Sequence, residues 1–141
     1  MKKFLGIFAI VFAMFTALPA SAQSASSSDP FGNQPPITQK NIDEFLKIYE
    51  DVVVATQNNK NPTGSFKVVG WDMMRGAYIM SKVGVGMTML GPESDAVKQS
   101  KLGAIPKQTI PSDAELDLIK KNKPRFDAID AKHGWDPFKA P

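Results

Sequence analysis

The sequence contains no cysteine and a single histidine, which excludes several classes of chemistry. Without cysteine, the chain can form no disulfide, offers no thiolate nucleophile and has no thiol that could be acylated in a lipoprotein. A serine nucleophile would depend on His133 as its base, and no Gly-x-Ser-x-Gly elbow presents such a serine. His133 also directly precedes Gly134 at an expected helix end, where a histidine interacts well with exposed carbonyls. We therefore predict that the protein is not an enzyme.

Paired carboxylates, phosphate-binding loops and basic clusters are scarce as well. The four glutamates lie at expected helix starts or on polar faces, and no two of them suggest glycoside cleavage. Gly84 and Gly86 form a Gly-x-Gly, but a third glycine and a preceding strand are missing. The basic residues are scattered rather than gathered on one face, so we expect no nucleic-acid partner.

The first 22 residues have the pattern of a signal peptide. Lys2 and Lys3 form a basic start, Phe4 to Leu18 is an uninterrupted apolar run, and Ala20 to Ala22 supplies small residues for a signal peptidase. We predict cleavage after Ala22 and a periplasmic or secreted protein. The apolar run of about fifteen residues is shorter than the roughly twenty that a spanning helix needs, so no stable membrane span is expected after cleavage.

The mature chain is a small, nearly neutral domain. Removal of 22 of the 141 residues leaves 119, enough for one domain with a modest core. The loss of Lys2 and Lys3 lowers the net charge from +3 to +1. Residues 23–36 are rich in serine and proline and poor in apolar side chains, which predicts a flexible leader. The helical domain is expected at residues 37–135 and a frayed tail at 136–141.

Two flanking helices are well marked in the sequence. Thr38 is a candidate N-cap for a helix that ends before the turn-forming run 58–64. The apolar residues of this helix repeat at helical spacing: Ile42, Phe45, Leu46, Tyr49, Val52 and Val53. Near the other end of the chain, Ser112 and Glu115 form a capping-box signature, Pro124 is expected to break or kink the helix, and Gly134 is placed to cap it.

The segment 71–90 is expected to form the centre of the domain. It carries five of the seven methionines, and Met73, Met80 and Met87 recur every seven residues, which predicts one long apolar face on a helix. Three glycines inside it each cost about 1 kcal/mol relative to alanine, so burial must outweigh propensity. The glycines indicate either close approach of a neighbouring helix or a break near Gly84 and Gly86.

These elements together predict an all-α domain, a small bundle of three to four helices after a cleaved signal peptide. Residues 65–70 are compatible with a strand or with a helical lead-in, although no second strand of convincing length is present for pairing. Residues 92–102 have room for one short extra helix that begins at Pro92 and ends before Gly103.

The predicted function is binding through an apolar surface around residues 71–90, with a protein partner or a second copy of the chain as its target. The residues expected on this surface are Trp71, Met74, Tyr78, Met80 and Met87. One alternative is Cu(I) binding by Met87, Met89 and His133, since thioether and imidazole donors suit this ion. On an unbroken helix Met87 and Met89 point about 200° apart, so copper binding requires a break. Another alternative is transport of a small apolar ligand between the helices.

Two short stretches carry a resemblance to known proteins. Residues 37–45 (ITQKNIDEF) and 130–135 (DAKHGW) resemble the two short signatures of small secreted bacterial helical proteins of unassigned function. The resemblance implies export and a helical fold. We thus expect an exported, non-enzymatic binding or interaction protein, such as a modulator, an inhibitor or a chaperone-like factor.

Overall fold

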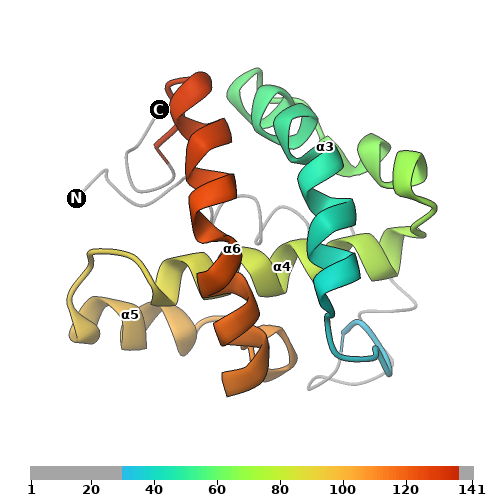
Figure 1. Cartoon of the computed structure of the whole chain (residues 1–141). Helices are drawn as coiled ribbons and strands as arrows, with labels where there is room; N and C mark the ends of the chain where they lie inside the picture. The colour runs from blue at the N-terminus through green and yellow to red at the C-terminus, as the bar shows by residue number, and fades with distance from the viewer. Residues whose placement is uncertain (1–29, 137–141) are drawn as a thin grey trace.

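The computed structural model describes residues 30–136, and within this range every regular element is helical. The elements are α3 (Gln39–Gln57), η1 (Pro62–Val69), α4 (Met73–Met89), α5 (Asp95–Leu102), η2 (Lys107–Thr109) and α6 (Asp113–Lys132), where η denotes a 3-10 helix (Figure 1). The all-α prediction is confirmed, and the two 3-10 helices bring the number of helical elements above the expected three to four. The predicted signal peptide, residues 23–29 of the leader and residues 137–141 of the tail lie outside the described residues.

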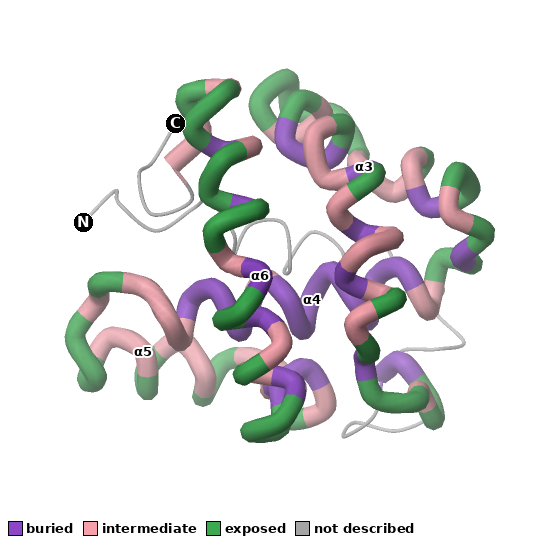
Figure 2. Tube along the Cα trace, viewed as in Figure 1, coloured by how far each residue is buried: buried purple, intermediate pink, exposed green. Residues whose placement is uncertain are grey.

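Helix α4 lies at the centre of the fold, as the sequence predicts. It passes behind α3 and α6, which both cross it (Figure 1), and most of it is buried (Figure 2). Twelve of its seventeen residues are buried. A helix that is apolar around most of its circumference is expected in such an interior position. Asp72 caps its first turn by accepting a hydrogen bond from the Arg75 N–H at 2.7 Å.

The glycines of α4 allow two neighbours to approach its backbone. A methyl group at Gly76 would overlap the ring of Phe66 from η1, and one at Gly86 would overlap the Ile119 side chain from α6. The helix runs without interruption through Gly84 and Gly86, so it has no break there. Close approach of Phe66 to Gly76 and of Ile119 to Gly86 explains the glycines at these two positions. Packing of Phe66 and Ile119 against the helix backbone at Gly76 and Gly86 offsets the low helix propensity of these glycines.

The connection before α4 is a 3-10 helix, which answers the question of strand or helix at residues 65–70. Asn61 caps η1 by accepting from the Thr63 N–H at 3.0 Å, and Gly70 ends it with a φ of 74°. A side chain is disfavoured at such a positive φ, so Gly70 is required for the sharp turn into α4. Phe66 on η1 is buried against both Gly76 and the ring of Trp71.

Helix α6 continues through Pro124, so of the two expected effects of this proline, a break or a kink, the break is wrong. The capping box at Ser112 and Glu115 is present, as is the capping box of Thr38 at the start of α3. At the other end, Gly134 has a φ of 59° and donates its N–H to the Ala131 carbonyl, while Trp135 donates its N–H to the Asp130 carbonyl. This pair of bonds is a Schellman motif, which confirms the predicted cap.

Two local expectations need correction. Phe31, assigned to the flexible leader, is only 2% exposed and packs edge-on against Tyr78 of α4 at a centroid distance of 6.0 Å. A single aromatic ring can therefore attach this segment to the core in spite of the low apolar content around it. Helix α5 is capped by Ser94 rather than started by Pro92, because the Ser94 side chain accepts from the Val97 N–H.

Candidate functional site

The residues expected to form an apolar surface lie in the core instead. Trp71, Tyr78, Met80 and Met87 are buried, and Met74 is partly buried against the same cluster. The expected surface is thus not on the outside of the described chain. Of the three methionines on the predicted apolar face of α4, Met80 and Met87 are buried and Met73 is exposed. Elements on several sides cover the helix: α3, η1, η2, α5 and α6 all contact it.

The three candidate copper ligands are not brought together. Because α4 is unbroken, Met87 and Met89 point to opposite sides of it, and Met87 is buried. Gly86 contacts Ile119, and His133 lies fourteen residues further along α6, which is about 20 Å at the helical rise. Within residues 30–136, no group of three or more His, Cys, Asp and Glu side chains is arranged to hold a metal ion.

The most exposed large apolar side chains lie just before and at the start of α4. Val68 is 74% exposed on η1 and Met73 is 40% exposed in the first turn of α4, and we call these two residues the apolar corner. The other exposed large apolar residue among those described is Val54 on α3, at 38%. An exposure of 74% is unusual in this chain, where the apolar residues of α3 and α4 are mostly buried.

Hydrogen bonds of the residues around Val68 hold the backbone of the apolar corner. The Gly70 N–H donates to the Lys67 carbonyl and the Trp71 N–H donates to the Phe66 carbonyl, each at 3.1 Å. The indole N–H of Trp71 donates to Glu44 Oε2 at 3.1 Å, which ties the corner to α3. Val68 is therefore presented on a fixed backbone, so little conformational entropy is lost when a partner covers it.

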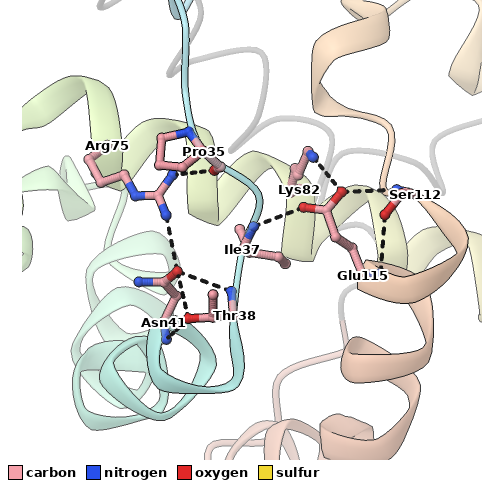
Figure 3. A network of polar contacts seen from close by, with 8 residues as sticks. All are labelled: Pro35, Ile37, Thr38, Asn41, Arg75, Lys82, Ser112 and Glu115. Carbon is pink, nitrogen blue, oxygen red and sulfur yellow. Dashed lines mark hydrogen bonds and ion pairs between the residues drawn. The ribbon is translucent and has the colours of Figure 1, made fainter.

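A buried carboxylate of α6, that of Glu115, joins this helix to α4 and to the segment that leads into α3 (Figure 3). Glu115 Oε1 accepts from Lys82 Nζ of α4 at 2.5 Å and from the Ser112 N–H at 3.0 Å. Its other oxygen, Oε2, accepts from the Ile37 N–H at 3.0 Å, and both charged side chains are buried. The arrangement satisfies two backbone donors and one ammonium group with a single side chain.

Burial and hydrogen bonding shift the pKa of Glu115 in opposite directions. Burial raises the pKa of this carboxyl group, whereas the hydrogen bonds from Lys82, Ser112 and Ile37 lower it, and the net pKa is below its ordinary value of 4.5. Glu115 therefore stays ionised and pairs with Lys82. Each of the four polar groups is satisfied inside this network, so its contribution is to hold helices together rather than to leave a reactive group free.

A second polar group connects the middle of α3 with the C-terminal end of α6, and we call it the α3–α6 clasp. It consists of Tyr49 and Glu50 from α3 with Asp130, Lys132 and His133 at the end of α6. The Tyr49 hydroxyl donates to Asp130 Oδ1 at 2.9 Å. Lys132 Nζ lies 2.6 Å and His133 Nε2 2.7 Å from Glu50 Oε1. The Tyr49–Asp130 bond is the buried part of the clasp, while the contacts of Glu50 are near solvent.

The two acidic residues of the clasp respond differently to their surroundings. Hydrogen bonds from Lys132 and His133 hold the pKa of Glu50 below its ordinary value. Burial raises the pKa of Asp130 to about 6, and the negative charges of Asp127 and Asp136 act in the same direction. Burial and the charge of Asp130 also raise the pKa of Tyr49, which keeps its hydroxyl protonated as a donor.

An open depression on α5 is lined by Ala96, Val97, Ser100 and Lys101, and it does not include the methionines expected to surround a small apolar ligand. None of the helices within residues 30–136 combines the length and the apolar character that crossing a membrane requires.

Few sequence signals mark the polar and exposed residues of these sites. Val68 lies in a stretch that was compatible with either a strand or a helix, and Lys82 reads as one charge in an apolar segment. Asp130 falls within the short DAKHGW stretch, yet its tyrosine partner is 81 residues away in the chain.

Comparison of the chain with protein-family models, with curated proteins and with solved structures finds no match.

Proposed function

We propose that the chain is an exported, non-enzymatic binding protein of the bacterial envelope, which engages a protein partner through the apolar corner. Such a protein would act as a modulator, an inhibitor or a chaperone-like factor. The proposal of export depends on the signal-peptide pattern of residues 1–22. The proposal of binding depends on one observation above all, the 74% exposure of Val68 on a firmly held turn.

The apolar corner replaces the surface that the sequence predicted, and it lies at the start of the same segment. Met73 is the first residue of α4, and Val68 lies on the element that leads into it. A rigid backbone that presents an exposed apolar side chain is the kind of feature that anchors a protein interface. Complete burial of a valine side chain stabilises a complex by about 1.5 to 3 kcal/mol, which corresponds to roughly a tenfold to hundredfold gain in affinity.

The experiment that tests this proposal is site-specific photo-crosslinking. A photoreactive amino acid replaces Val68 in one variant and exposed Asp117 of α6 in the control, and both mature chains are irradiated in periplasmic extract. We expect a discrete cross-linked protein from position 68 and none from position 117. Native mass spectrometry of the purified mature chain then shows whether the partner is a second copy.

The affinity of the chain for the captured protein must also depend on Val68. Val68→Asp should weaken its binding at least tenfold, because a carboxylate would have to be desolvated at the contact. Val54→Asp on α3 makes the same change at an exposed valine outside the corner and should leave the affinity unchanged. Equal affinity for both variants, or equal cross-linking from positions 68 and 117, would refute the proposal.

A further inference from the structure

Pro124 divides α6 into two halves, and both contact α3: Asn122 of the first half exchanges hydrogen bonds with Gln39, and Phe126 of the second half packs on Tyr49. The first half carries Ile119, which contacts Gly86, and Glu115, which pairs with Lys82, so it is fixed to α4. The second half, residues 125–132, lies along α3 (Figure 1). Proline has no backbone N–H, so one hydrogen bond of the helix is missing at the boundary between the two halves. This position is the natural place for the helix to bend.

The second half of α6, which we call the arm, is held on α3 mainly by aromatic packing. The ring of Phe126 meets Tyr49 edge-on at a centroid distance of 4.9 Å and lies 5.8 Å from the ring of Phe45. Ion pairs of the arm with α3, such as Arg125 with Asp43 at 2.7 Å, are largely exposed and contribute little. The Tyr49–Asp130 hydrogen bond is the polar contact of the arm that is shielded from solvent.

We propose that the arm is a pH-sensitive element, whose docking on α3 weakens when Asp130 ionises and whose motion about Pro124 uncovers the aromatic rings of α3. Protonated Asp130 is a neutral group in an apolar contact, and it still accepts the Tyr49 hydroxyl bond. Ionised Asp130 carries a buried charge that no cation contacts at hydrogen-bond distance among the described residues, and release of the arm returns this charge to water. The inference is independent of the apolar corner.

The charged groups around Asp130 support this direction. Asp127, one turn earlier on α6, and Asp136, beyond its end, both disfavour the ionised form. Tyr49 on α3 and Lys123 on α6 favour it, but burial has the largest effect and raises the pKa of Asp130 from 3.8 to about 6. The raised pKa means that the docked state binds a proton more tightly than the released state. Docking is therefore strongest in acid and weakens as the pH rises through about 6.

Amide hydrogen exchange of the mature chain tests this inference. After correction for intrinsic exchange rates, the amides of residues 126–132 should exchange about tenfold faster at about pH 7.5 than at about pH 5. Amides of residues 116–123, in the half fixed to α4, should show no such increase. An equal increase in both halves would mean that the chain opens as a whole, and it would overturn the proposed motion about Pro124.

Four variants identify the titrating group. Asp130→Asn keeps the shape and cannot ionise, so the difference between the two pH values should disappear from the arm. Asp117→Asn, a matched change at an exposed position of the same helix, should keep this difference, and so should His133→Gln, which removes the imidazole at the end of α6. Tyr49→Phe removes a donor that favours the carboxylate, so the midpoint should move to higher pH. Persistence of the full difference in Asp130→Asn, or its loss in His133→Gln, would overturn the proposal.

Discussion

Loss of Glu115 should destabilise the protein far more than loss of its partner Lys82. In Glu115→Ala, the ammonium group of Lys82 and the N–H groups of Ile37 and Ser112 all lose their acceptor inside the protein. Breaking a buried ion pair in this way typically costs about 3 to 5 kcal/mol. In Lys82→Met, the carboxylate keeps both backbone donors and remains in the first turn of α6, where the helix dipole favours it. We expect a cost of about 1 to 3 kcal/mol for this variant.

Urea denaturation, followed by circular dichroism, measures both changes. A domain of this size is stabilised by about 5 to 15 kcal/mol in total, so Glu115→Ala could remove most of the stability. Glu115→Gln provides a milder second variant, because its amide oxygen can still accept a hydrogen bond while the charge is lost. We expect its stability to lie between those of Glu115→Ala and the unmodified protein. Equal costs for Glu115→Ala and Lys82→Met, or a cost below about 1 kcal/mol for Glu115→Ala, would refute the reasoning.

Three further predictions concern packing and pH. Gly76→Ala should lower the free energy of unfolding by about 1 to 3 kcal/mol, because the new methyl group overlaps Phe66; an unchanged melting temperature would contradict the close approach. Met80→Ala should cost about 2 to 5 kcal/mol with or without added metal, as for a core methionine, and a metal-dependent melting temperature would contradict its core role. The pKa of Glu115 is lowered, so its stabilising effect is present above about pH 4.5 and lost as the pH falls through its folded value. The pKa of Asp130 is raised, so the stability that its protonated form contributes is lost as the pH rises through about 6. The two effects together predict that the melting temperature is highest in mild acid. A highest melting temperature above pH 7 would contradict this prediction.

Local sequence signals located the helices because the interactions that start and end a helix lie within one turn of the chain. The hydroxyl groups of Thr38 and Ser112 reach N–H groups three residues away, and Gly134 adopts its positive φ within the cap itself. Such contacts depend little on the rest of the protein. The all-α class, the capped ends of α3 and α6 and the central position of α4 could therefore be predicted from the sequence alone.

Burial of the predicted binding residues was decided by tertiary structure. The periodicity of methionines in α4 shows which face is apolar, but an apolar face can equally pack inside the domain or against a partner. Contacts with η1 and α6, made possible by Gly76 and Gly86, enclose this face within the domain. The exposed apolar position, Val68, follows from the turn geometry of η1 and has no periodic signal.

The sequence by itself determined where α3 and α6 begin, where α6 ends and which helix faces are apolar, since these properties depend on neighbouring residues. Tertiary structure decided which polar side chains meet, because the partners lie far apart in the chain. Lys82 and Glu115 are separated by 33 residues, and Tyr49 and Asp130 by 81. Burial raises the pKa of Asp130, whereas hydrogen bonds from Lys82 and from the Ile37 N–H help to lower the pKa of Glu115, and both effects arise only when α3, α4 and α6 pack together.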